Sequence, residues 1–124
     1  MRRRPVLEAP EALVPLKPVH YLLLLALAHG DRHGYALKKD VLRRTGGMVK
    51  LGPGTLYRSI RFLEEKRLIE ETEERPDPAL DDERRRYYRL TPLGRRVAAA
   101  EIARLESIVE MARAKRLVPR PRTS

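Results

Sequence analysis

The stretch of residues 51–68 constrains the fold most, because it reads as one amphipathic helix with two kinds of face. Pro53 near its start suits the first position of a helix. Leu56, Ile60 and Leu63 recur at i, i+4 and i+7, so they form one apolar stripe that must be buried. The other faces carry hydroxyl and guanidinium groups: Thr55, Arg58, Ser59 and Arg61. Such a helix anchors with one side and presents basic groups on another.

Length and charge limit what the chain can be. Its 124 residues suffice for one small domain. The 27 lysines and arginines exceed the 17 acidic residues, for a net charge of +10. A surplus of this size favours a polyanionic partner, although basic residues also serve solubility. The chain has no cysteine. Disulfides and cysteine-ligated zinc are therefore excluded.

No membrane segment is predicted. The longest apolar run, 21–28, is too short to span a bilayer. The arginines at 2–4 are followed by prolines and glutamates rather than by an apolar region, so no signal peptide is predicted. We expect a cytoplasmic protein.

The first half of the chain predicts an arm and three helices. Four prolines punctuate residues 1–18, which we interpret as a partly disordered arm with room for one short helical turn. Residues 20–29 are apolar almost all round, as in a buried central helix. Residues 34–44 form a second helix, and 53–67 the third. The second helix should turn four side chains largely inward: Tyr35, Leu37, Val41 and Leu42.

The second half predicts two strands and a long helix. Segments 68–75 and 86–90 have moderate β-branched and aromatic content, and 76–83 is too long for a tight hairpin turn. Thr91 then suits the N-cap of a helix that runs to about Leu117.

Three helices followed by a two-stranded ribbon are typical of a winged helix-turn-helix. The fold class is therefore mainly α with a small two-stranded β wing, plus a C-terminal dimerisation helix. The expected divisions are an arm (1–18), the DNA-binding domain (19–91), the dimerisation helix (92–118) and a disordered tail (119–124). The ribbon carries Arg84, Arg85 and Arg86, with Arg75 on its far side. Basic groups on the wing and on the third helix could hold phosphates on both sides of a groove in double-stranded DNA. The alternative is a charge run that is simply solvated.

Four segments resemble the PadR family of bacterial transcriptional regulators. They are HGYAL at 33–37, GTLY at 54–57, LEEKRLI at 63–69 and RRYYRLTPLG at 85–94. The resemblance implies a homodimer, usually a repressor, that binds inverted repeats near promoters and often responds to a small molecule. The single C-terminal helix resembles the branch of the family with a short dimerisation region.

The resemblance also implies roles for individual residues. Residues His33 to Tyr35 would form a structural turn that opens the second helix. Seven residues would contact DNA, four from the recognition helix and three from the wing: Thr55, Tyr57, Arg58, Arg61, Arg84, Arg85 and Arg86.

Two positions depart from the family pattern. Arg67 stands where the family usually has glycine, so either it takes an uncommon conformation or the helix ends differently. Phe62 stands where a basic or polar residue is usual. It could touch a thymine methyl group or pack under the wing, and we favour packing.

The last helix carries a spacing typical of paired helices. Five apolar residues follow a 4-3-4-3 pattern: Ala98, Ile102, Leu105, Val109 and Ala112. The pattern lasts about two heptads, so the alternative is packing on the helix's own domain. The dimer interpretation gains support because two copies can read a palindrome. Leu93 and Val97 should tie the helix to its own domain, and the arm could cover part of the seam.

An effector cannot be named from the sequence. Four residues could line a small apolar site but fit an ordinary core or interface better: Tyr21, Tyr35, Met48 and Met111.

Other functions fit the sequence less well. A metal-responsive sensor would depend on His20, His29 and His33, but Gly30 interrupts any helix that could align the last two, so no metal or other cofactor is predicted. No nucleophile is paired with a base and no glycine-rich phosphate loop is present, so an enzyme is not predicted. A non-specific architectural DNA-binding protein remains the closest alternative.

Overall fold

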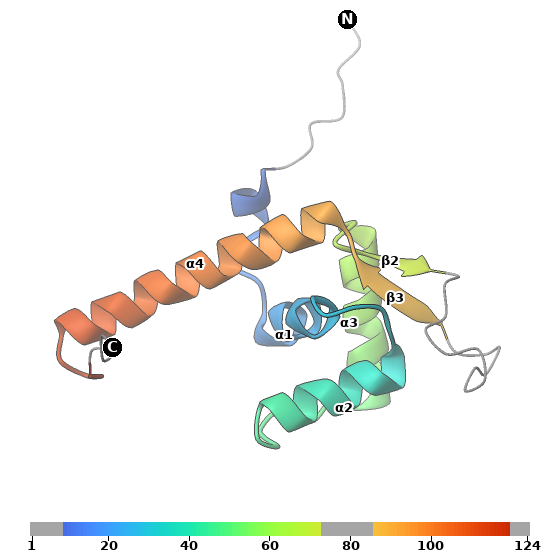
Figure 1. Cartoon of the computed structure of the whole chain (residues 1–124), viewed down its shortest axis with the longest axis horizontal. Helices are drawn as coiled ribbons and strands as arrows, with labels where there is room; N and C mark the ends of the chain where they lie inside the picture. Colours follow the sequence, from blue (N-terminus) through green and yellow to red (C-terminus); the bar gives the residue numbers. More distant parts are fainter. Residues whose placement is uncertain (1–8, 73–85, 120–124) are drawn as a thin grey trace, which may run out of the picture.

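The computed structural model describes residues 9–72 and 86–119, which form five helical elements and three strands. Figure 1 shows α1 near the centre, with α4 above it and α2 below it, while α3 runs beside it from the level of α2 to the start of α4. The elements are η1 (Pro10–Leu13), α1 (Pro18–Leu27), β1 (Arg32–His33), α2 (Gly34–Arg44), α3 (Pro53–Glu65), β2 (Ile69–Thr72), β3 (Tyr87–Leu90) and α4 (Pro92–Ala114). Each predicted helix is present, and η1 is the short turn expected in the arm. The helix ends differ from the predicted ones by a few residues.

The sheet has one strand more than predicted. It is antiparallel with the order β1-β3-β2, and Ile69 pairs with Leu90 while His33 pairs with Tyr87. The predicted wing strands correspond to β2 and β3. The sequence could not reveal β1, because two residues are too few for an alternating pattern. The fold class, mainly α with a β wing, is confirmed.

The core lies where α1 meets α2 and α3. Leu23, Leu24 and Leu27 of α1 are buried against apolar residues of the other helices, among them Leu37 and Ile60. One prediction for α2 is wrong: Tyr35 is exposed, with the ammonium of Lys39 lying 4.8 Å from its ring centroid. It follows Gly34, which is buried at the start of the helix, and one step along a helix turns a side chain to a different face.

Helix α3 ends in a left-handed residue. Arg67 has a φ of 61°, and the amide of Leu68 donates to the Leu63 carbonyl oxygen at 2.9 Å, as in a Schellman motif. Arg67 therefore takes the uncommon left-handed conformation, which was one of the two possibilities predicted from the sequence. An arginine here takes a backbone shape that glycine adopts at less cost.

Helix α4 is tied to the end of α3 by its N-cap. The Thr91 hydroxyl accepts from the Gly94 amide at 2.9 Å and donates to the Arg67 carbonyl oxygen at 2.7 Å. A Cβ at Gly94 would collide with the Leu68 carbonyl group. Glycine at this position therefore lets the first turn of α4 lie directly against the chain that leaves α3.

The two halves of α4 have different surroundings. Near its start, Val97 and Glu101 are fully buried, and the helix packs against η1 and α1. Figure 1 shows the far half extending past the domain. There Ile108, Val109 and Met111 are exposed. In this structure of one chain, the apolar stripe of α4 is thus covered at one end and open at the other.

Candidate nucleic-acid interface

The outer face of α3 presents all four predicted contact residues. The Pro53 start and the buried stripe of Leu56, Ile60 and Leu63 set the orientation of the helix on the core. The four exposed residues are Thr55, Tyr57, Arg58 and Arg61. The prediction of an outer face for Ser59 is wrong. Ser59 is buried, and its hydroxyl donates to the Thr55 carbonyl oxygen at 2.7 Å.

Tyr57 of α3 leans toward the start of α2. Its hydroxyl oxygen lies 3.5 Å from the place that a Cβ at Gly34 would occupy, which is an ordinary van der Waals distance. His33 caps α2, since its Nδ1 accepts from the Ala36 amide at 3.1 Å. The predicted structural turn at the start of α2 is confirmed, and it lies beside the Tyr57 ring.

One flank of α3 faces the sheet. Glu64 lies among Glu71, Arg86 and Arg61, and both burial and the charge of Glu71 raise the pKa of its carboxyl group, while the two arginines act in the opposite direction. Arg86 is exposed at the start of β3, with its Nε 3.8 Å from a carboxylate oxygen of Glu71. The arginine of the wing and the arginine of the helix therefore lie on the same flank.

The predictions for the rest of the wing fall outside the described residues. Arg75, Arg84 and Arg85 belong to the segment 73–85. The described part of the sheet packs into the core: Tyr88 is buried, and burial is the main cause that raises the pKa of its hydroxyl to about 12. Tyr88 is therefore neutral at physiological pH and serves as a core residue.

The other flank of α3 faces the start of α1. Phe62 stacks on His20, with ring centroids 4.3 Å apart and an interplanar angle of 10°. Phe62 packs against the protein as expected, but its aromatic partner is His20 of α1 rather than a residue of the wing. Burial, and secondarily the charge of Lys17, lowers the pKa of His20. His20 is therefore mostly neutral at pH 7. Neither His20 nor Lys17 was predicted from the sequence as a neighbour of α3.

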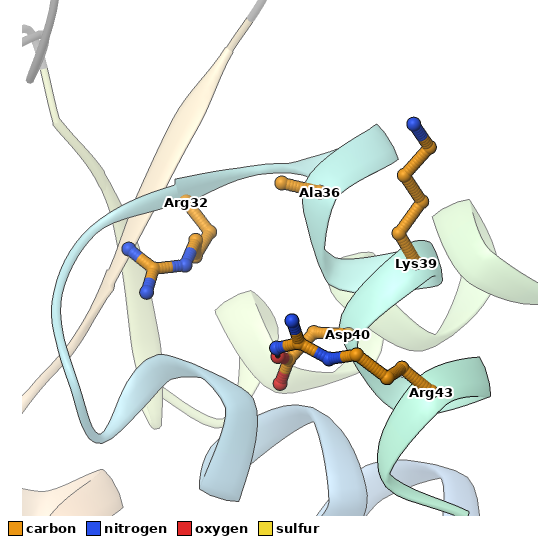
Figure 2. Close-up of a pocket in the computed structure, with 5 residues that line it drawn as sticks. All are labelled: Arg32, Ala36, Lys39, Asp40 and Arg43. Carbon is orange, nitrogen blue, oxygen red and sulfur yellow. Dashed lines mark hydrogen bonds and ion pairs between the residues drawn. The ribbon is translucent and has the colours of Figure 1, made fainter. Parts of the chain in front are cut away.

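A second group of charges surrounds α2. Figure 2 shows Arg32 reaching from β1, with Lys39, Asp40 and Arg43 on α2, around a hollow of about 420 Å³. Asp40 is buried and accepts from Arg43 Nη2 at 2.8 Å and from Arg44 Nε at 2.9 Å. One acidic residue is thus surrounded by four basic ones, which adds to the positive field of this side of the domain.

In the described residues, the requirements of a metal site and of a membrane-spanning helix are not met. Within residues 9–72 and 86–119, no three histidine, cysteine or acidic side chains gather as metal ligands would. In the same ranges, no helix is both long and apolar enough to cross a bilayer.

The sequence comparisons are specific. The profile of the transcriptional regulator PadR-like family matches residues 23–100. An uncharacterised 37.1 kDa protein in transposon Tn4556 of Streptomyces fradiae is 39% identical over 80 residues, which are 64% of this chain and 21% of that protein. Protein X of Lysinibacillus sphaericus, also uncharacterised, is 31% identical over 74 residues, 60% of this chain and 65% of its own length. The matched regions thus span only part of both relatives.

Solved structures share the fold. A transcriptional regulator from Clostridium thermocellum superposes with a TM-score of 0.66 at 25% identity, covering 77% of this chain and 87% of its own. A PadR family regulator from Clostridium difficile gives 0.64 at 23% identity, covering 79% and 97%. RosR of H. salinarum gives 0.58 at 24% identity, covering 82% and 96%. The matched residues run from the second half of α1 through α2, α3 and the strands to the start of α4, and this chain belongs to the PadR-like family of transcriptional regulators.

Proposed function

We propose that this chain is a sequence-specific DNA-binding regulator that acts as a homodimer on a palindromic promoter site. We further propose that it represses transcription and that a small-molecule effector releases it from DNA. The observation that carries the proposal is the exposed face of α3, where Thr55, Tyr57, Arg58 and Arg61 stand outward while the apolar stripe is buried.

Double-stranded DNA is the partner that this face fits. A helix on the surface of a small domain can enter the major groove, where arginine and hydroxyl side chains meet base edges. Arg86, at the base of the wing, is exposed on one flank of that helix. We extend the proposal to Arg84 and Arg85, which lie outside the described residues and follow from the basic sequence of the wing and from the family resemblance. Contacts on two sides of the groove fix the register of the helix on the duplex.

The far half of α4 supports the dimer. Val109 lies on the seam predicted from the sequence, and the exposed Ile108 and Met111 lie next to it. Ala98 packs against the domain's own core, so the proposed contact between two copies begins beyond it. The seam then comprises Ile102, Leu105, Val109 and Ala112. Paired helices along this seam would present two recognition helices to two half-sites.

Selection of bound fragments from a random duplex library, with mapping of bound sites in the host genome, tests the proposal. We expect an enriched inverted repeat near promoters and an affinity that falls on the order of a thousandfold between low and moderate salt. Equal affinity for palindromic and random duplexes would instead support an architectural protein. A reporter placed behind an enriched site distinguishes repression from activation.

A further inference from the structure

A basic hollow lies on the flank of α3 that faces away from the wing. It has a volume of about 380 Å³ and lies between the start of α1 and the outer side of α3. The residues used below are Lys17, His20, Thr55, Arg58 and Phe62. Positions three or four apart share a face of a helix, so 55, 58 and 62 form one row, while 57, 61 and 64 form another. Glu64 in the second row has Glu71 and Arg86 of the sheet as its charged neighbours.

The charge in this hollow is positive. Its lining has two permanently charged groups, the Lys17 ammonium and the Arg58 guanidinium, and no carboxylate. In the part of the chain with described coordinates, no acidic side chain pairs with either of them. Lys17 is close enough to His20 that its charge lowers the pKa of the imidazole. Two cations from different elements therefore converge without an anion to balance them.

Arg58 is folded back along its own helix. Its Nη2 lies 3.5 Å from Thr55 Oγ1, and its Nη1 lies 3.2 Å from the place that a Cβ at Gly54 would occupy. The absence of a side chain at Gly54 thus leaves room for the guanidinium beside the first turn of α3. In this position Arg58 lines the hollow toward Lys17. Arg61 belongs to neither the hollow nor this row.

The groups at this site match a phosphodiester in chemistry. A guanidinium can donate two parallel hydrogen bonds to phosphate oxygens, and an ammonium and a hydroxyl add single ones. The start of α1, which is the positive end of its helix dipole, also lies at the hollow. The stacked rings of His20 and Phe62 form one wall, which holds the start of α1 beside α3. Phosphates of the DNA backbone border the major groove on both sides of an inserted helix.

We propose that this hollow holds a backbone phosphate of the bound DNA, with Lys17 and Arg58 as its ligands and Thr55 as a hydrogen-bond donor. Arg58 is then a phosphate contact, and the task of reading a base falls to Arg61. The wing holds the strand on one border of the groove, and the start of α1 holds the strand on the other. This inference rests on the proposed DNA-binding function and deepens it.

Substitutions at the two cations test the assignment on a duplex recovered by selection. Lys17→Ala and Arg58→Ala should each weaken binding about tenfold, lower the slope of log affinity against log salt by about 1, and leave the selected base preference as it is. Arg58→Lys should restore the salt slope, because a phosphate accepts either cation, whereas a guanine edge requires the guanidinium fork. Lys115→Ala, beyond the far end of α4, is the control for loss of one positive charge. Circular dichroism shows whether each variant is folded.

Single methylphosphonate substitutions in the same duplex locate the contact. The wild-type protein should lose affinity at one phosphate per half-site, and Lys17→Ala should lose little more there. A changed base preference in Arg58→Ala, or a wild-type salt slope in Lys17→Ala, would overturn the inference while the proposed function stands. A wild-type protein that binds no duplex would overturn both.

Discussion

The two halves of α4 belong to one continuous helix, but they have different roles. In the first half, Val97 is fully buried against the domain's own core, and Glu101 is fully buried beside it. In the second half, Ile108 and Met111 are exposed. The apolar spacing continues through both halves, so the sequence pattern does not tell which part serves the domain. Burial in the single chain makes that distinction.

The comparison also limits what the predicted seam can mean. Ala98 packs on the domain, whereas Val109 is exposed. The same apolar stripe of α4 thus packs on its own domain at one end and is open at the other, where a second copy could bind. Substitutions in the first half should therefore affect folding, and substitutions in the second half should affect association.

Charges introduced in the two halves should have different outcomes. Val97→Asp would bury an unpaired carboxylate at a cost of several kcal/mol, enough to abolish the cooperative unfolding transition of a small domain. Val109→Asp should keep that transition and its helical content but give monomers with weak operator binding. Calorimetry and sedimentation velocity measure the two effects.

Leu105, at the boundary between the halves, provides a second test of the proposed dimer interface. It is half-buried in the single chain, and we expect Leu105→Asp to give folded monomers. If both Val109→Asp and Leu105→Asp remain dimeric, the proposed interface lies elsewhere. If Val97→Asp folds normally, the first half is not part of the domain core.

Glu101 should give an intermediate effect that depends on pH. Its carboxylate accepts from Arg104 Nη2 at 2.7 Å and Nε at 3.0 Å, and the hydrogen bond from Arg104, together with that from the Leu16 amide, lowers its pKa despite burial. Because the folded pKa lies below the unfolded one, this contribution is present near neutral pH and is lost as pH falls through the folded pKa. We expect Glu101→Ala to cost about 2 kcal/mol near neutral pH and to flatten the acid limb of the stability curve.

Glu110 is the matched control in the far half of α4. It is exposed, and its partner atom Arg113 Nη1 is 3.6 Å away. Glu110→Ala should change the free energy of unfolding by less than about 0.5 kcal/mol. Thermal unfolding followed between pH 3 and pH 7 compares the two variants. Equal pH dependence of Glu101→Ala and the wild type would contradict the role given to the buried carboxylate.

The smallest effects concern the left-handed residues after α3 and α4. Arg67 has a φ of 61° and Arg116 a φ of 60°. Glycine takes this conformation more readily, so Arg67→Gly should raise the free energy of unfolding by up to about 1 kcal/mol. Arg116→Gly should change it less, because the chain around Arg116 is exposed and has less packing to lose. Urea denaturation compares them, and a larger effect at Arg116 would mean that the far end of α4 is part of the cooperative unit.

Much of the fold could be predicted from local signals. Pro53 and Thr91 mark helix starts, and the stripe of Leu56, Ile60 and Leu63 predicts the buried side of α3. These signals depend on residues close together in the sequence. The partner of Phe62 could not be predicted in this way, because His20 lies far from it in the sequence.

The charged residues of the interior and of the flanks were the hardest to predict. Glu101 is buried, with Arg104 three residues along its own helix and Leu16 of the arm as its partners. Asp40 is likewise buried against basic residues on its own helix. Spacings of three and four would equally suit ion pairs on an exposed face, so they do not predict burial. Lys17 gains its importance only from the position of α1 beside α3. The sequence gives no signal for that tertiary arrangement or for the contact of Leu16 with Glu101.

Several contacts fix the first half of α4 to the domain: the Thr91 hydroxyl bridges the end of α3 and the first turn of α4, Gly94 lies against the Leu68 carbonyl group, and Val97 is buried in the core. Helix α4 has 23 residues and is about 35 Å long, so a change of direction at its fixed end is amplified at its far end. A tilt of 10° would move the far end by about 6 Å, nearly two base-pair steps of about 3.4 Å. In a dimer built on that far end, the separation of the two reading helices would depend on the packing of the first half of α4 against its own domain. Operators with different half-site spacings could then be matched by changes in that packing, with the recognition helix itself left as it is.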